Sequence, residues 1–114
     1  MPVYKERDSL QEKISDTFKR RISHLDKLML VVCDFTGGPA SEPDPPHSHP
    51  HEQITYVAEG ELYFFLGDEK HLLRTGDVCT IPSGVPHCIQ IISGYVRLVD
   101  SFSPLRQDYL KTKP

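Results

Sequence analysis

The stretch that decides the fold is residues 61–102, ELYFFLGDEKHLLRTGDVCTIPSGVPHCIQIISGYVRLVDSF. Short runs rich in aliphatic and aromatic residues alternate here with turn signals such as Gly-Asp, Pro-Ser-Gly and Ser-Gly. Runs of this length, at regular spacing and bounded by turn residues, are typical of β-strands joined by tight turns. We therefore expect strands at 61–66, 70–74, 78–81, 87–92 and 95–102.

The residues before this stretch extend the same pattern. We expect a hairpin of 18–24 and 27–35, and one more strand at 53–58. Between them, residues 36–46 (TGGPASEPDPP) are predicted to form a loop, because proline cannot donate to a sheet ladder. With about eight short strands and no long amphipathic helix, the chain is predicted to be all-β, either a sandwich or a barrel.

The N-terminal segment differs from the rest. Residues 1–17 are polar and only weakly periodic, so they fit a short helical turn or an ordered arm that adds an edge strand or contacts a partner subunit. The 114 residues suffice for one compact domain, and no linker divides them. We predict an arm at 1–17 followed by a single domain at 18–114.

Composition and charge exclude several classes of function. There are 13 Lys and Arg against 16 Asp and Glu, a formal charge of −3, which argues against binding to nucleic acid or to an anionic membrane surface. The longest apolar run, 28–33, is too short to cross a bilayer, and the N-terminus is too charged for a signal peptide. Three cysteines make neither an even disulfide framework nor a CxxC pair, so we expect a reducing, cytoplasmic environment.

Four of the six histidines, at positions 47, 49, 51 and 87, cluster around two turns. If 47–49 is extended, His47 and His49 project from the same face, where two imidazoles can share a metal ion. His87 follows a Pro-Gly turn that could direct it toward the same ion. The pair alone is also compatible with solvated histidines in an exposed, proline-rich loop.

The wider pattern resembles the two motifs of the cupin superfamily. Residues 47–61, HSHPHEQITYVAEGE, are similar to the first motif, and residues 76–87, GDVCTIPSGVPH, are similar to the second. This resemblance implies a single cupin jelly-roll β-barrel, commonly paired as a homodimer, with a metal ion in its mouth. The ligands that it implies are His47, His49, Gln53 and His87.

Two neighbours of Gln53 compete with it as ligands. Glu52 is one residue short of the motif spacing and would point to the opposite face of an extended strand. His51 shares parity with His47 and His49, but the motif does not require it. Three imidazoles and one amide would leave a divalent ion its full positive charge, and these donors suit Ni, Zn, Fe, Mn or Co.

The C-terminal stretch 100–108, DSFSPLRQD, carries a second group of candidate residues. Asp100 and Phe102 share parity, so both can face the barrel interior, and Arg106 follows the turn at Pro104. We expect Asp100 to be a general acid or base and Arg106 to bind an anionic substrate. Each residue also has a purely structural interpretation. Asp100 could cap a turn at the end of its strand, Phe102 could pack in the core, and Arg106 could pair with Asp108 at the surface.

Taken together, HSHPHEQ, the Gln ligand and the C-terminal stretch resemble the pectin-degradation cupins. This narrower resemblance implies conversion of a 4,5-unsaturated uronate to its linear keto form, with Asp100, Phe102 and Arg106 at the catalytic site. The alternatives are a cupin dioxygenase or isomerase acting on another small molecule, and a cupin that binds a metabolite without catalysis.

Overall fold

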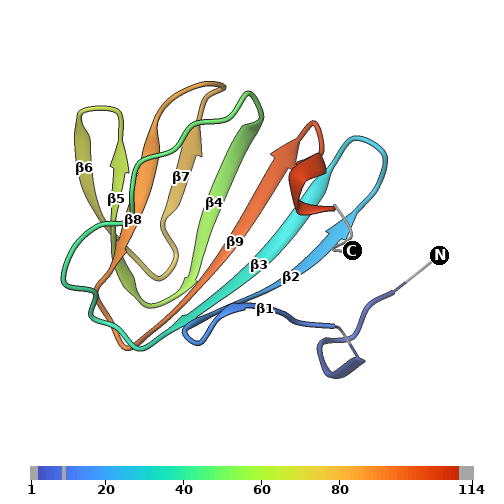
Figure 1. The fold of residues 1–114 in the computed structure, drawn as a ribbon, viewed down its shortest axis with the longest axis horizontal. Helices are drawn as coiled ribbons and strands as arrows, with labels where there is room; N and C mark the ends of the chain where they lie inside the picture. The colour runs from blue at the N-terminus through green and yellow to red at the C-terminus, as the bar shows by residue number, and fades with distance from the viewer. Residues whose placement is uncertain (1–2, 9, 111–114) are drawn as a thin grey trace.

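The computed structural model describes residues 3–8 and 10–110, and these residues form two antiparallel sheets. The larger sheet has the strand order β1-β2-β3-β9-β4-β7, and the smaller has the order β6-β5-β8 (Figure 1). The strands are β1 Glu12–Ser15, β2 Phe18–His24, β3 Met29–Thr36, β4 Glu52–Glu59, β5 Glu61–Leu66, β6 Glu69–Arg74, β7 Val78–Ile81, β8 His87–Ile91 and β9 Tyr95–Ser103. Two short 3₁₀ turns are added, η1 Glu6–Asp8 and η2 Gln107–Tyr109. No helix in the described part of the chain is long and apolar enough to span a membrane.

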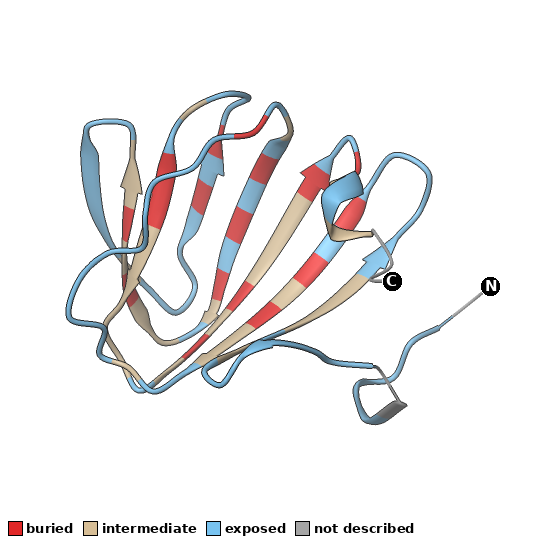
Figure 2. Ribbon diagram, viewed as in Figure 1, coloured by how far each residue is buried: buried red, intermediate tan, exposed pale blue. Residues whose placement is uncertain are grey.

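The core lies between the inner faces of the two sheets. It contains buried side chains from β3, β4 and β9 of the larger sheet together with Leu62 and Phe64 from β5 of the smaller one. Along β4, buried and exposed residues alternate strictly from Glu52 to Val57, which Figure 2 shows as red and pale-blue bands. This period of two is what an extended strand with one buried face requires, and it sends Gln53, Thr55 and Val57 inward.

The strands agree with the sequence prediction to within a few residues at their ends. The predicted loop 36–46 is confirmed except at its first residue: Thr36 ends β3, and residues 37–46 contain no strand. It still runs beside β8, where the backbone N–H groups of Ala40, Asp44 and His47 donate to carbonyls of that strand. The four prolines at 39, 43, 45 and 46 interrupt any regular ladder, since they have no N–H to donate.

The N-terminal arm contributes an edge strand, which is one of the roles that its sequence allowed. Strand β1 pairs with β2 between Glu12 and Ser15, and η1 precedes it. Whether the arm and the domain divide at residue 17 stays a prediction. Residues 1, 2 and 9 of the predicted arm and 111–114 of the predicted domain lie outside the described residues.

One glycine fixes the sharp turn between the two sheets. Gly60 joins β4 to β5 and adopts φ +101°, and a Cβ at this position would lie 2.5 Å from the carbonyl oxygen of Tyr95. A side chain is therefore excluded both by the backbone conformation and by space. The turn carries the chain directly from the larger sheet to the smaller one, so that the two sheets face each other across the core.

Candidate metal centre and active site

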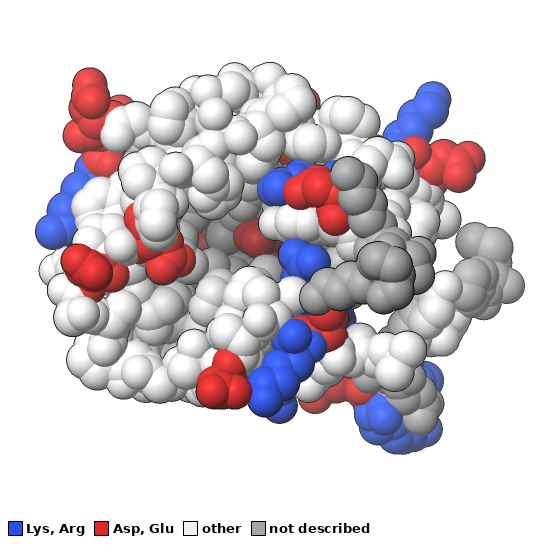
Figure 3. All heavy atoms as spheres, viewed as in Figure 1, with Lys and Arg blue, Asp and Glu red and all other residues white. Residues whose placement is uncertain are grey.

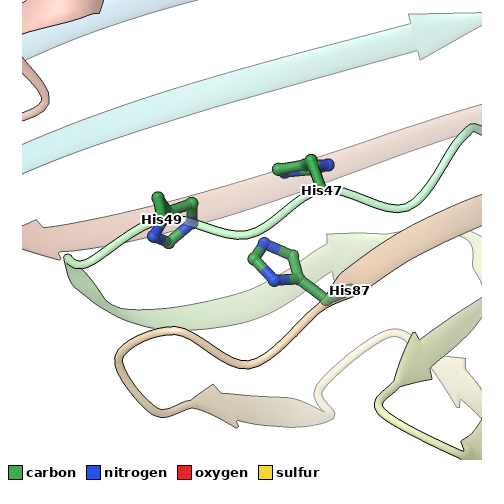
Figure 4. A group of neighbouring side chains, drawn as sticks. All are labelled: His47, His49 and His87. Carbon is green, nitrogen blue, oxygen red and sulfur yellow. The ribbon is translucent and has the colours of Figure 1, made fainter.

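Three imidazole rings converge at one end of the space between the sheets (Figure 4). His47 and His49 lie on the loop before β4, and His87 is the first residue of β8. One ring nitrogen of each lies within 4.8 Å of those of the other two. The backbones of His47 and His87 exchange two hydrogen bonds, of 3.0 and 2.9 Å, so the loop is held against β8 at the point where the rings meet.

Hydrogen bonds to the backbone orient two of these rings. Nδ1 of His49 lies 3.0 Å from the carbonyl oxygen of His51, and Nδ1 of His87 lies 2.9 Å from that of Val85. Because a carbonyl only accepts, each Nδ1 carries the proton and each Nε2 has a free lone pair. Metal-binding histidines are characteristically held in this way.

Two further observations fit a metal ion. Nε2 of His87 is buried and has no hydrogen-bond partner, although buried polar atoms rarely lack one. Burial lowers the pKa of both His49 and His87, and the positive charge of Arg106 lowers both further. Both rings are therefore kept neutral, which is the form that coordinates a metal.

Gln53 completes a set of four neutral donors. Its side chain is buried, and its Oε1 lies 3.0 Å from Nε2 of His49. Glu52 is exposed on the opposite face of β4, as the parity of the strand predicts. His51 is half-buried; its carbonyl holds His49, and its own Nδ1 is buried without a hydrogen-bond partner. Three imidazole nitrogens and one amide oxygen suit a divalent transition metal ion.

Asp100 lies next to this donor set, across the ladder between β4 and β9. It is in register with Thr55, and its Oδ1 accepts a hydrogen bond of 2.7 Å from the Thr55 hydroxyl. Its Oδ2 accepts a longer contact of 3.6 Å from the Cys33 thiol. Burial raises the pKa of Asp100 above its usual range, although the hydrogen bonds and the charge of Arg106 oppose the shift. A carboxyl whose pKa is raised in this way is a candidate for proton transfer.

Phe102 and Arg106 lie beside Asp100 but also have structural partners. Phe102 is buried in the core and contacts the ring of His49 edge-on, with the centroids 5.8 Å apart. The Arg106 guanidinium lies 4.2 Å from the centre of the Tyr109 ring and makes two hydrogen bonds to Asp108, of 3.1 and 2.7 Å. The pairing with Asp108 that the sequence left open is therefore present, yet the Arg106 side chain is only 12% exposed and borders the cavity.

These groups share a cavity of about 200 Å³ between the sheets. Figure 3 shows a hollow in the viewed face of the molecule, with basic side chains along one side of it. Of the seven site residues expected from the sequence, His49 alone does not line the cavity; those that do are His47, Gln53, His87, Asp100, Phe102 and Arg106.

Among the cavity residues that sequence reasoning did not single out are Cys33, Thr55 and Tyr109, which contact Asp100 or Arg106. Thr55 could have been found, because it lies two residues after Gln53 on the same strand and so shares its face. Cys33 and Tyr109 gave no such signal. Their positions depend on the pairing of β3 with β9 and on the path of the chain after Pro104.

Comparison with known proteins agrees with this geometry. Residues 34–102 match the Cupin domain family. Over 101 residues the chain is 36% identical to the pectin degradation protein KdgF of Dickeya dadantii (strain 3937), which covers 87% of this chain and 89% of that protein. The solved structure of KdgF from Halomonas sp. is similar with a TM-score of 0.85 and 28% sequence identity, covering 95% of this chain and 99% of that one.

A shorter match concerns another activity. Over 53 residues, 46% of this chain, the sequence is 42% identical to quercetin 2,3-dioxygenase of Bacillus subtilis (strain 168), and the match covers 15% of that enzyme. By contrast, the similarity to each of the two KdgF proteins covers most of this chain and most of the KdgF chain. The all-β jelly-roll prediction is confirmed, and the chain belongs to the cupin family, within which it is a homologue of KdgF.

Proposed function

We propose that this protein is a metal-dependent enzyme that converts a 4,5-unsaturated uronate to its linear keto form. The observation that carries the proposal is one cavity lined by His47, His87, Gln53 and the carboxyl group of Asp100, with the third histidine of the cluster, His49, in contact with Gln53. The similarity to KdgF proteins over nearly the whole chain supports this substrate class.

The residues proposed to hold one divalent ion (Ni, Zn, Fe, Mn or Co) are His47, His49, Gln53 and His87. The backbone hydrogen bonds of His49 and His87 and the buried, unpartnered Nε2 of His87 support this set. Once bound, an ion held by four neutral donors would supply Lewis-acid polarisation of a substrate oxygen with its full charge.

Arg106 is proposed to bind the substrate carboxylate. In the structure its guanidinium makes a two-pronged contact with the carboxylate of Asp108, which is the geometry that a uronate carboxylate would also use. The Asp108 side chain is 53% exposed, so it can give way to the substrate at little cost in buried contacts. Phe102 and Tyr109 pack against the guanidinium and keep it at the border of the cavity.

Asp100 is proposed to move the proton. In ring opening the anomeric hydroxyl loses its proton while the ring C–O bond breaks, which leaves an aldehyde and an enol. The enol then becomes a ketone when a proton adds to the adjacent carbon and the enol hydroxyl gives up its own. No atom is gained or lost overall, so a single carboxyl that accepts a proton and returns it suffices. The raised pKa of Asp100 suits this double role.

The direct test is loss of the ultraviolet absorbance of the unsaturated uronate on addition of metal-loaded protein. We expect a rate above the uncatalysed one that disappears after treatment with a chelator and returns when the metal is added back. A rate equal to the uncatalysed one in metal-loaded protein would overturn the proposal.

The second candidate is a cupin dioxygenase, favoured by the local similarity to quercetin 2,3-dioxygenase. Oxygen consumption by the Fe(II)-loaded protein in the presence of a candidate substrate would support it. If neither activity is found and Asp100→Asn changes no measurable property except ligand affinity, a non-catalytic metabolite-binding cupin is the better description.

A homodimer is proposed as the assembly. The outer face of the larger sheet carries exposed apolar side chains on β3, β4 and β7, among them Leu30, Ile54, Tyr56 and Val78. A second copy of the chain can cover this patch about a two-fold axis, because each copy presents the same surface. Light scattering should give twice the chain mass, and the double variant Ile54→Lys, Tyr56→Lys should be monomeric, whereas Leu72→Lys on the smaller sheet should not. A monomeric wild-type protein would overturn this.

The cytoplasm is proposed as its location. All three cysteines, Cys33, Cys79 and Cys88, are buried free thiols in the structure. Free thiols persist in a reducing compartment. Fractionation of cells that express the protein tests this, and recovery from an exported fraction would contradict it.

A further inference from the structure

The carboxamide of Gln53 has two ends of nearly the same shape, and only one of them can bind a metal. The oxygen has lone pairs, whereas the NH₂ group is a donor without any. If the amide turned by half a rotation, the histidines would face two N–H groups and the fourth donor would be lost. A protein group that engages the NH₂ end would therefore direct the oxygen toward the histidines before an ion binds.

We propose that Thr55 is the positioning residue that turns the Gln53 oxygen toward the histidines. The inference rests on the metal site put forward above, and it concerns a residue that neither the sequence motifs nor the comparisons single out. Thr55 is fully buried, at 0% exposure, and lies two residues after Gln53 on the inner face of β4.

The hydrogen bonds run in one direction along this row of side chains. The Thr55 hydroxyl donates its only proton to Oδ1 of Asp100, at 2.7 Å. Its oxygen is then left to accept, and it does so from Nε2 of Gln53 at 2.9 Å. With the NH₂ end engaged by Thr55, Oε1 of Gln53 faces Nε2 of His49 at 3.0 Å.

Reversing the amide would break this order. The Gln53 oxygen would face a Thr55 oxygen whose proton is already committed to Asp100, so that two acceptors would meet inside the core. A buried polar group without its partner costs free energy, so the Thr55 end of the row disfavours the reversed orientation. The Thr55 hydroxyl thus links Asp100 to Gln53. Because Asp100 accepts the hydroxyl proton, the hydroxyl oxygen accepts from the NH₂ group of Gln53, and Oε1 of Gln53 faces His49.

The backbone holds the row in place. In the ladder between β4 and β9, Gln53 is opposite Phe102 and Thr55 is opposite Asp100. Both pairs point inward, so the spacing of the side chains is set by the strands. Cys33 contacts the other oxygen of Asp100, which leaves Oδ1 to Thr55.

The variant Thr55→Val tests the proposal, because it keeps the branched shape of the side chain and replaces the hydroxyl with a methyl group. The readout is titration of chelator-treated protein with Co²⁺, followed by visible absorption, with circular dichroism and thermal melting of the metal-free protein to verify folding. We expect Thr55→Val to bind Co²⁺ about 10- to 100-fold more weakly, with an altered Co²⁺ spectrum. Thr55→Ser keeps the hydroxyl and should bind within a few-fold of wild type.

Two controls separate positioning from a general effect on the fold. Thr80→Val makes the same substitution at an exposed position on the neighbouring strand β7 and should leave Co²⁺ affinity unchanged. In a Gln53→Ala background, Thr55→Val should cause no further loss of Co²⁺ affinity, because the amide that it positions is absent.

Wild-type affinity in folded Thr55→Val, or an equally weak Thr55→Ser, would overturn the inference, as would a wild-type protein that does not bind Co²⁺. The titration needs no substrate, so its outcome is independent of the uronate assay. If Co²⁺ affinity follows the Thr55 hydroxyl but no uronate is turned over, the proposed activity fails and the role of Thr55 stands.

Discussion

Two aspartates on the larger sheet show how the face of a strand decides the chemistry of a side chain. Asp34 on β3 points outward, where Arg97 lies directly opposite it on β9. Asp100 on β9 points inward, where neutral side chains donate to it, among them those of Thr55 and Cys33. The two strands are paired with each other, so the aspartates share a sheet but not an environment.

The pKa values shift in opposite directions for this reason. Burial opposes ionisation of Asp34, but hydrogen bonds from Arg97 and Tyr95 and the charge of Arg97 outweigh it, and the pKa is lowered. Burial also dominates at Asp100, and there the hydrogen bonds and the charge of Arg106 are too weak to reverse it, so the pKa is raised. A cation in direct contact makes a carboxylate a fixed structural charge, whereas neutral partners leave it able to exchange a proton.

The largest expected effect is on catalysis by Asp100. Asp100→Asn keeps the shape of the side chain and an oxygen that can accept from Thr55, but it cannot accept and return a proton. We expect turnover of the unsaturated uronate to fall by about 10²- to 10⁴-fold. Steady-state kinetics at saturating metal measures this, with Asp34→Asn as the matched control on the other face. Equal losses in the two variants would remove the distinction between the two aspartates.

The next effect is on stability at Asp34. Asp34→Asn removes the negative charge of the carboxylate, which accepts hydrogen bonds from Arg97 at 2.7 and 3.2 Å. The Arg97 side chain is 27% exposed in the structure, so its charge would be left without this partner in a largely buried position. We expect the free energy of unfolding to fall by about 1.5–3 kcal/mol, with turnover unchanged. Urea denaturation provides the measurement. A stable variant with reduced turnover would assign Asp34 a role in catalysis instead.

The stability difference between wild type and Asp34→Asn should also depend on pH. Since the folded-state pKa of Asp34 is lowered, its ionised form stabilises the fold above the unfolded-state pKa, and this contribution is lost as pH falls through the folded-state value. The difference in unfolding free energy should therefore be constant near neutrality and shrink between about pH 5 and pH 2. Urea denaturation of both proteins across this range tests it, and a difference that grew at low pH would contradict the direction of the shift.

The smallest expected effect is at the cationic partner. Arg97→Lys keeps the charge but loses the two-pronged contact with Asp34, so the free energy of unfolding should fall by only about 0.5–1 kcal/mol. Thermal melting of Arg97→Lys and Asp34→Asn at neutral pH shows which of the two variants loses more stability. A loss as large as that of Asp34→Asn would mean that the planar guanidinium, and not the charge, holds the pair.

Much of the candidate site could be predicted because its information is local. The alternation along β4 separates Gln53 from Glu52, and that along β9 places Asp100 and Phe102 on one face. Both inferences need only the period of an extended strand. The histidine pair and the turn before His87 are equally local, and the structure brings His47, His49 and His87 together.

The partners of these residues could not be predicted in the same way. The contact of Arg106 with Asp108 is an exception, because the two residues are close in the sequence, but whether Asp100 meets a cation or a hydroxyl depends on which strands pair and in which register. The contact of Cys33 with Asp100 joins residues that are distant in the sequence. The two-residue period of a strand says which face a side chain is on, but not which residue of another strand lies next to it.

The sequence by itself determined the strands, their inward faces and the residue types at the site, because turn residues and the two-residue period act over a few positions. Only the tertiary structure decided that Asp100 lies beside Thr55 and that Asp34 lies beside Arg97. Strand pairing across the sheet sets those neighbours, and the neighbours set the charge state of each carboxyl group.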